Sequence, residues 1–327
     1  MVEGEVLEDV RGFLKSRVIL SAAELDLFTR LDGQRATADD LMAVLKCDRR
    51  ALTRLLDCLV TFQLLVKEDG LYQTTKRGTH LSSKHPKSEL PMVLHLNGLW
   101  ATWSGLTETV KTGTNPCRKP VTERSKDSLK DFIGAMHVVG RGLSREIAES
   151  YDLSPFKRLL DIGGATGTYT IAFLEKNPKM TAALFDMPDV IPWAEERLGA
   201  EGLLNRVELV GGDFYKDDLP SGCDLALLSA IIHQNSPEEN LELYRKIHRA
   251  LLPGGKVLIR DHVMDPDRTH PHQGTLFAIN MLVNTKGGDT YTFAEIREAL
   301  EKAGFVDGKM VRKGERMDCL VEAHKPA

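Results

Sequence analysis

Apolar residues recur at helical spacing over the first hundred residues of the chain. The pattern predicts a helix over 18–31, a second that begins behind Thr37 as its N-cap, and a third that begins behind Asp48. Residues 64–75 then alternate around an Asp-Gly pair, which is typical of a two-stranded hairpin with a tight turn. Three helices followed by a hairpin predict a winged helix.

A winged helix can bind DNA, or it can serve as a protein-interaction or dimerisation module. Residues 1–85 contain 13 Lys plus Arg and 13 Asp plus Glu, whereas a DNA-binding module usually carries a basic footprint. The third helix carries Arg49, Arg50 and Arg54, but apolar residues cover most of its circumference, as in a helix buried in protein. The charge and the pattern together favour dimerisation.

The second half of the chain alternates between strand and helix patterns, which predicts an α/β domain. Residues 111–131, with two prolines, one glycine and many charges, are typical of a connection. We therefore expect a dimerisation domain over 1–110, connecting helices over 111–150 and an α/β domain over 151–327.

Composition narrows the class of protein. The chain has 327 residues, of which 42% are hydrophobic and 28% charged, and a net charge of −4, which indicates a globular protein without a general attraction to nucleic acid or anionic membranes. No apolar run approaches the ~20 residues of a membrane span, and the first residues are not a signal peptide. The five cysteines are widely spaced and form no C-x-x-C pair. We expect a cytoplasmic protein with no nucleic-acid or membrane partner.

The strongest chemical signal is "FKRLLDIGGATGTYTIAFLEK", residues 156–176. It predicts a strand that ends at Asp161, a glycine turn, and a helix that begins near Thr168. Glycines in such a turn allow backbone N–H groups to approach a ligand at the positive end of the helix dipole. Alone the motif is only moderately specific, because nicotinamide and flavin proteins use similar turns.

Three acids at successive strand ends narrow the choice of cofactor. Asp161 precedes the glycines, where a carboxylate would repel a pyrophosphate but suits the cationic amino group of S-adenosylmethionine. Asp186, 19 residues beyond Gly167, can accept hydrogen bonds from ribose hydroxyls, and Asp213 can meet an adenine amino group with Phe214 beside the ring. Strand ends in an open α/β sheet line its binding crevice. The pattern predicts S-adenosylmethionine.

A second site is predicted where the apolar run over 225–232 meets His233. The run indicates a buried strand that delivers an imidazole to the same crevice, and imidazole suits base chemistry near neutral pH. A capping or core histidine is the alternative. His262, His270 and His272 resemble a metal-ligand cluster, but two lie in a proline-rich loop and no fourth ligand has suitable spacing, so we expect no metal site.

The chain resembles the S-adenosylmethionine-dependent O-methyltransferases that carry an N-terminal winged-helix dimerisation domain. These include plant caffeate-type and acetylserotonin enzymes and bacterial natural-product tailoring enzymes. The likeness runs from about Val18 to Glu322, through "LLDIGGATGTY", "FDMPDV", "GGDFY", "LLPGGKVLIRDHV" and "NTKGGDTYTFAEIREALEKAGF". It implies a Rossmann-like, seven-stranded class I methyltransferase sheet with an antiparallel last strand behind a mainly α winged-helix domain. It also implies a homodimer and metal-independent methyl transfer to a small molecule.

The resemblance assigns roles to residues. His233 takes the position of the catalytic base, and Asp261 stands where relatives carry a glutamate, so we expect it to hold the imidazole. The expected cofactor-binding residues are Asp161, Gly163, Gly164, Gly167, Asp186, Met187, Asp213, Phe214 and Ser229. The expected acceptor-binding residues are Met136, His137 and Asn280.

The sequence also departs from the family pattern. The third glycine of the loop is Ala165, which fits if that residue keeps φ below zero. Ser229 stands where plant members have a lysine, Gln234-Asn235 replace a common Asp-Trp pair, and Thr290 replaces a second glutamate. The favoured reaction is O-methylation of a small aromatic or polyketide-like molecule. S- or C-methylation, or a non-methylating reaction, stays open, and a DNA-binding regulator is less favoured.

Overall fold

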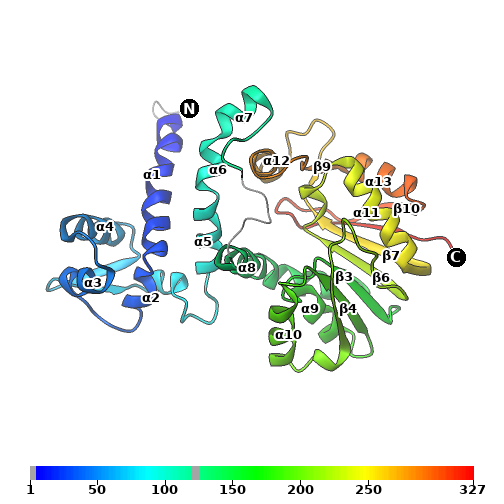
Figure 1. Cartoon of the computed structure of the whole chain (residues 1–327), viewed down its shortest axis with the longest axis horizontal. Coiled ribbons are helices and arrows are strands. Elements are labelled where there is room, and N and C mark those ends of the chain that lie inside the picture. Colours follow the sequence, from blue (N-terminus) through cyan, green and yellow to red (C-terminus); the bar gives the residue numbers. More distant parts are fainter. Residues whose placement is uncertain (1–4, 119–125) are drawn as a thin grey trace. The chain divides into compact units, whose positions relative to one another are not determined.

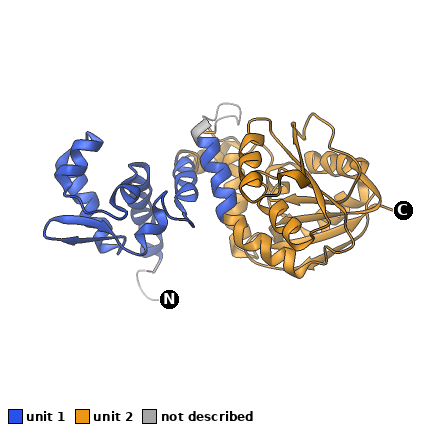
Figure 2. Ribbon diagram, turned by 90° about the horizontal axis from the view of Figure 1, so that it is seen from below, with its two compact units in different colours: residues 1–100, 121–138 blue, residues 101–120, 139–327 orange. Residues whose placement is uncertain are grey.

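The protein is described here from a computed structural model, which covers residues 5–118 and 126–327. Its chain forms two compact units, residues 1–100 with 121–138 and residues 101–120 with 139–327 (Figure 2). The domain limits expected at 110 and 150 stay predictions, and part of the expected connection, 119–125, lies outside the described residues.

The first unit contains the hairpin and the helices expected behind Thr37 and Asp48, but the helix expected over 18–31 is divided in two, because Asp26 takes a left-handed φ of 56°. Its elements are α1 (Glu5–Glu24), α2 (Leu27–Leu31), α3 (Ala38–Leu45), α4 (Arg49–Thr61), β1 (Leu65–Glu68), β2 (Leu71–Thr74), η1 (Gly78–Leu81) and α5 (Leu90–Gly98). Thr37 and Asp40 form a capping box at α3, Asp48 caps α4, and β1 pairs antiparallel with β2. Leu52, Leu56 and Leu59 of α4 are buried, so its apolar face packs within the unit.

The second unit is built on a seven-stranded sheet, as the resemblance implies. Its strands are β3 (Arg158–Ile162), β4 (Thr181–Asp186), β5 (Val207–Gly211), β6 (Cys223–Ser229), β7 (Leu251–Asp261), β10 (Val306–Arg312) and β11 (Cys319–His324). Their order is β10-β11-β7-β6-β3-β4-β5; the last strand in the chain, β11, runs antiparallel to its neighbours β7 and β10, and the other pairs are parallel. A short parallel pair, β8 (Val263–Met264) with β9 (Tyr291–Thr292), lies apart from this sheet.

Helices cover both faces of the large sheet (Figure 1). α9 (Thr168–Lys176) and α10 (Ile191–Ala200) share a core with Leu159, Leu227 and Leu258 on one face. α11 (Pro237–Ala250) and α13 (Phe293–Lys302) share a second core with alternate strand residues on the other face. The remaining helices are α6 (Trp100–Ser104), α7 (Leu106–Thr112), α8 (Lys126–Ser150), η3 (Leu204–Arg206), η4 (Ile232–Gln234) and α12 (His272–Asn284). Within the described ranges, no helix combines the length and apolarity needed to cross a bilayer.

The predicted end of the strand before His233 is wrong. The apolar run over 225–232 suggested a strand reaching His233, but β6 ends at Ser229. Ala230 has φ 58°, a left-handed conformation that turns the chain out of the strand. His233 therefore lies in the short helix η4 beyond the strand end.

Candidate active site

The carboxyl ends of parallel strands bring the predicted acids to one edge of the sheet. Asp161 and Asp261 lie at the ends of β3 and β7, and Asp186 ends β4. Because β6 pairs with both β3 and β7, Asp161 lies opposite Leu227 and Ser229 lies opposite Arg260. Ligands of open α/β sheets bind at this edge.

The glycine loop follows β3 and is held by the neighbouring strand. Gly163 has φ 68°, donates a 2.8 Å hydrogen bond from its N–H to the Phe185 carbonyl, and has no room for a Cβ, which would lie 2.6 Å from Ile231 Cδ1. The condition under which an alanine would fit this loop without strain, a φ below zero, is not met, since Ala165 has a φ of 49°. Its N–H donates to Asp186 Oδ2 at 2.7 Å, and this bond accompanies the left-handed conformation.

Asp161 is a buried carboxyl of this edge with a raised pKa. The residue is only 2% exposed, and its Oδ2 accepts a 2.6 Å hydrogen bond from Thr170 Oγ1. Burial raises the pKa of Asp161 to about 6, the Thr170 hydroxyl opposes this rise, and the nearby Asp186 adds to it. A cation at this position would favour the ionised carboxylate.

Asp186 and Asp213 have different surroundings. Asp186 accepts hydrogen bonds from the N–H groups of Ala165 and Met187, and burial raises its pKa. Asp213 is partly buried, which alone would raise its pKa, but its ion pair with Lys216, 2.9 Å between Nζ and Oδ2, lowers it below the usual range. Phe214 packs on the core and against Tyr215.

One orphaned polar atom supports a ligand at the glycine loop. Thr166 lies between Ala165 and Gly167, and its buried Oγ1 has no hydrogen-bond partner within the described chain. Buried polar atoms in native proteins are usually paired. A ligand with polar groups, such as the expected cofactor, would supply the missing partner, so the loop fits that group.

His233 and Asp261 are in direct contact, a point that the sequence left open. Nδ1 of His233 lies 2.9 Å from both Oδ1 and Oδ2 of Asp261. The Asp261 residue is 1% exposed, and Oδ1 also accepts from the His262 N–H at 2.8 Å. Burial alone would raise the pKa of Asp261, but the charge and hydrogen bond of His233 lower it. Among the described residues, Nε2 of His233 has no hydrogen-bond partner.

Phe277 of α12 packs beside two histidines. Its ring meets His233 edge-on, with centroids 4.8 Å apart, and lies 5.1 Å from the His262 ring. His262 accepts a hydrogen bond at Nδ1 from the Met317 N–H, and burial lowers its pKa to about 4. The imidazole beside the candidate base is therefore neutral at physiological pH.

The loop after α12 supplies no second acid to His233. Asp289 forms an ion pair with Arg268, and Thr290 is buried. Gly288 packs so closely that a Cβ there would lie 2.4 Å from the His233 carbonyl oxygen. The loop thus supports the backbone of η4, and Asp261 is the one acid that bonds the imidazole within the described chain.

The predicted acceptor residues have less defined roles. Met136 and His137 lie on the part of α8 that belongs to the first unit, and their expected role stays a prediction. Asn280 of α12 is already engaged, because its Oδ1 accepts from Trp103 Nε1 and from Asn284 Nδ2, both at 2.9 Å. Its amide NH₂ is the group left for an acceptor.

The sequence reasoning missed a buried network around Asn235. This residue is 0% exposed; its Oδ1 accepts from the Tyr215 hydroxyl, its Nδ2 donates to Asn240, and its carbonyl accepts from the Tyr291 hydroxyl. Asn240 in turn donates to the Ile232 carbonyl. The network fixes the turn that carries His233, and its only sequence signal was the departure from the family pattern after the histidine.

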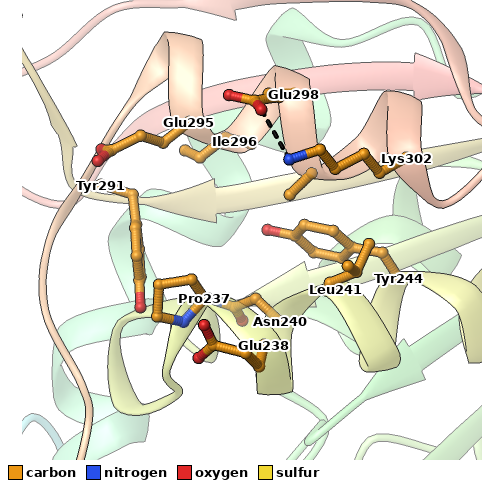
Figure 3. A pocket seen from close by; sticks show the side chains of 11 residues that line it. Pro237, Glu238, Asn240, Leu241, Tyr244, Tyr291, Glu295, Ile296, Glu298 and Lys302 are labelled. Atoms are coloured by element: carbon orange, nitrogen blue, oxygen red, sulfur yellow. Dashed lines mark ion pairs between the residues drawn. The ribbon is translucent and has the colours of Figure 1, made fainter.

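A surface groove of about 240 Å³ lies elsewhere, between α11 and α13 (Figure 3). Leu241, Tyr244 and Ile296 contribute its apolar lining and three glutamates its acidic side chains. None of the predicted site residues lines it. In the described part of the chain, no three His, Cys, Asp or Glu side chains are grouped as a metal site.

Comparison with known proteins agrees with this architecture. The O-methyltransferase domain family matches residues 109–306, and the O-methyltransferase dimerisation domain matches residues 7–84. The tetracenomycin polyketide synthesis 8-O-methyl transferase TcmO of Streptomyces glaucescens is 30% identical over 93% of this chain and 91% of its own. Acetylserotonin O-methyltransferase of Gallus gallus is 30% identical over 95% and 94%. The structure of PigF with SAH superposes with a TM-score of 0.89 at 25% identity, over 99% of this chain and 100% of that one.

The chain therefore belongs to the S-adenosylmethionine-dependent O-methyltransferases that carry a dimerisation domain. It is a methyltransferase whose cofactor is S-adenosylmethionine.

The pKa of Asp161 gives a testable prediction for the ligand-free protein. The pKa of Asp161 is about 6 in the folded protein, against an ordinary value of 3.8. Between these pH values the folded state binds more protons than the unfolded state, so the free energy of unfolding falls as the pH rises from 3.8 to 6. Asp161→Asn should raise the free energy of unfolding at pH 7.5 by up to about 3 kcal/mol, with little gain at pH 4. Urea unfolding at both pH values measures this. Asp213→Asn is the control, and a destabilised Asp161→Asn at pH 7.5 would contradict the assignment.

The left-handed Ala165 predicts a second change in stability. In a left-handed conformation the Cβ of Ala165 destabilises the folded state by about 1–2 kcal/mol, and Ala165→Gly removes this penalty. The glycine loses more conformational entropy on folding, which cancels about 0.5–1 kcal/mol of the gain. We expect a small net stabilisation in urea unfolding. Ala294→Gly, at an exposed helical position of α13, should instead destabilise. Equal losses in both variants would show that Ala165 is not strained.

Proposed function

We propose that this enzyme methylates a hydroxyl group of a small aromatic or polyketide-like molecule, with His233 as general base. The observation that carries the proposal is the His233–Asp261 pair at the sheet edge. The bound cofactor supplies an activated methyl group, so the protein's remaining tasks are to position the acceptor and remove its proton. A positioned imidazole meets the second task.

Asp261 sets the form of the base. Its ionised carboxylate accepts the Nδ1–H of His233, which leaves the Nε2 lone pair for the acceptor proton. When Nε2 takes that proton, the carboxylate stabilises the imidazolium. Phe277 packs on the ring and limits its rotation, and the neutral His262 adds no positive charge that would disfavour protonation.

The residues expected to hold the cofactor follow the edge of the sheet. Asp161 suits the amino group, Asp186 the ribose hydroxyls, and Asp213 with Phe214 the adenine. The backbone of the glycine loop would approach the ligand between them. Gly163, Gly164, Gly167, Met187 and Ser229 complete the proposed set.

The acceptor assignment rests on two supports. TcmO is named for methylation in the synthesis of a polyketide, and its similarity to this chain extends over 93% of this chain and 91% of its own. A base held by a buried carboxylate also suits a hydroxyl, which must lose a proton, better than a thiol that ionises readily. S-methylation, C-methylation and non-methylating reactions are the competing outcomes of the test below.

Loss of the imidazole should separate chemistry from binding. We expect His233→Ala to lower transfer of a labelled methyl group to the hydroxyl acceptors in a panel of phenols, hydroxyquinones and thiols by about 10² or more, while the Kd for S-adenosylhomocysteine stays unchanged. Asp261→Asn should reduce the rate as well, because an amide stabilises the imidazolium less. His272→Ala, at an exposed position, is the control.

Product analysis by mass spectrometry decides the reaction type. Label on oxygen with a strong His233→Ala effect supports the proposal. Transfer that is equal in wild type and His233→Ala, or label on sulfur or carbon, would refute the base or the acceptor class. Cofactor binding without any transfer would favour a non-methylating reaction.

We further propose a homodimer formed through the first unit. It matches the dimerisation domain, and α1 presents an exposed apolar face there, formed by Val6, Leu7, Val10, Phe13 and Leu14. Apolar patches of this kind mark protein interfaces. The unit's neutral charge supports a protein partner over DNA. The five cysteines are free, which supports a cytoplasmic location.

A charge on this face should break the dimer. Phe13→Glu would place a carboxylate in the apolar interface, so we expect a shift from dimer to monomer in analytical ultracentrifugation, with the helical circular dichroism retained. Val44→Glu, at an exposed position of α3 outside that face, should leave the dimer intact. A dimer that survives Phe13→Glu at low micromolar concentration would place the interface elsewhere.

A further inference from the structure

Arg260 is a buried cation that forms no ion pair with a carboxylate of the described residues. The residue is 4% exposed; its Nε donates to Ser229 Oγ at 2.9 Å and its Nη1 to the Met317 carbonyl at 3.0 Å. No carboxylate of the described chain forms an ion pair with it, whereas Arg312 pairs with both Glu146 and Asp318. A buried charge that lacks an opposite charge is costly, so this guanidinium indicates a missing anion.

Two hydroxyls lie beside this guanidinium. The Arg260 guanidinium carbon is 5.3 Å from the centroid of the Tyr169 ring, and Tyr169 is 7% exposed. Its buried hydroxyl has no hydrogen-bond partner in the described chain. The second hydroxyl is that of Ser229, whose Oγ accepts from Arg260 Nε. Burial raises the pKa of Tyr169, against the opposing effect of Arg260, so the hydroxyl stays protonated and can donate.

The three side chains therefore offer donors and no free anionic acceptor. Ser229 accepts from Arg260, which leaves its own proton for a ligand. Arg260 contributes guanidinium N–H groups, and Tyr169 contributes its hydroxyl. A carboxylate is the ligand group that suits a guanidinium with two neighbouring hydroxyls.

Their place in the sheet relates them to Asp161. Ser229 pairs with Arg260 across β6 and β7, and Asp161 of β3 pairs with Leu227, two residues before Ser229. Because side chains two positions apart share a face, Asp161, Ser229 and Arg260 lie on the same face. Tyr169 and Thr170 follow one another in α9, and Thr170 bonds Asp161. The carboxylate of Asp161 and the guanidinium of Arg260 thus lie on the same face of the sheet near the same edge.

We infer that Arg260, Tyr169 and Ser229 form the subsite for the α-carboxylate of the cofactor, while Asp161 receives its α-amino group. The inference rests on the cofactor-binding edge proposed above and adds a cation to it. The amino-acid part of the cofactor is a zwitterion. Its ammonium group is the opposite charge for Asp161, and its carboxylate is the opposite charge for Arg260. Arg260 is thus a cofactor-binding residue, and its burial in the ligand-free protein is offset when the carboxylate binds.

The test compares two ligands that differ in the amino-acid part. S-adenosylhomocysteine carries the α-carboxylate, and 5′-deoxy-5′-methylthioadenosine retains the nucleoside and sulfur without it. We expect Arg260→Met to raise the Kd of the first ligand about 10- to 100-fold and that of the second less than threefold, measured by calorimetry on the full-length protein. Arg260→Lys should recover part of the loss, and Arg312→Met, a cation already paired, should show no such selectivity.

Each other outcome has a clear meaning. Equal weakening of both ligands, or no weakening of either, would overturn the subsite and leave Arg260 as an anchor for the Met317 carbonyl. If Arg260→Met does not fold, Tyr169→Phe removes only the hydroxyl, and it must weaken S-adenosylhomocysteine selectively. A wild-type protein that binds both ligands equally contradicts the subsite alone. A wild type that binds neither contradicts the cofactor-binding edge and the subsite with it.

Discussion

The parallel pairing of β6 with β3 and β7 is the constraint on which the site depends. It sets Ser229 opposite Arg260 and places Asp161 opposite Leu227, two residues before Ser229 on the same face of the sheet. Because side chains alternate along a strand, Arg260 lies over the Tyr169 ring of α9, whereas the next residue, Asp261, bonds His233. A one-residue slip of β7 would exchange a carboxylate for a guanidinium beside the imidazole. The register of these buried strands decides which charge meets which ligand group.

The buried charged groups at this edge lower the stability of the ligand-free protein. Burial raises the pKa of Asp161 to about 6 and also raises that of Asp186, and the buried Arg260 forms no ion pair within the described residues. Asp261 behaves differently, because His233 lowers its pKa and the pair is complete within the chain. Asp161, Asp186 and Arg260 belong to the cofactor-binding edge that we propose, whereas the His233–Asp261 pair is the one that we propose for proton removal.

Local patterns in the sequence were sufficient for the elements and for the acids. Capping signals such as Thr37 predicted helix starts, and the motif around Asp161 predicted the strand, turn and helix there, because those features depend on neighbouring residues. The end of β6 was predicted wrongly and the sign of φ at Ala165 was left open, since both depend on contacts with other strands. The proximity of Tyr169 to Arg260 depends on sheet register and on packing across 91 residues, which one sequence does not display.

Asn235 shows how a departure from the family pattern changes the support of the base. An indole at this position would fill its space by apolar contact, whereas a buried amide is tolerated only with partners, because an unpaired one costs about 1–3 kcal/mol. Tyr215, Asn240 and Tyr291 provide those partners. Directional bonds restrict orientation more than apolar volume does, so they hold the turn that carries His233 in one arrangement. Tyr215 directly follows Phe214, the residue proposed to lie beside the adenine. Its hydrogen bond to Asn235 therefore connects that part of the proposed cofactor-binding edge to the turn that carries His233, the proposed base.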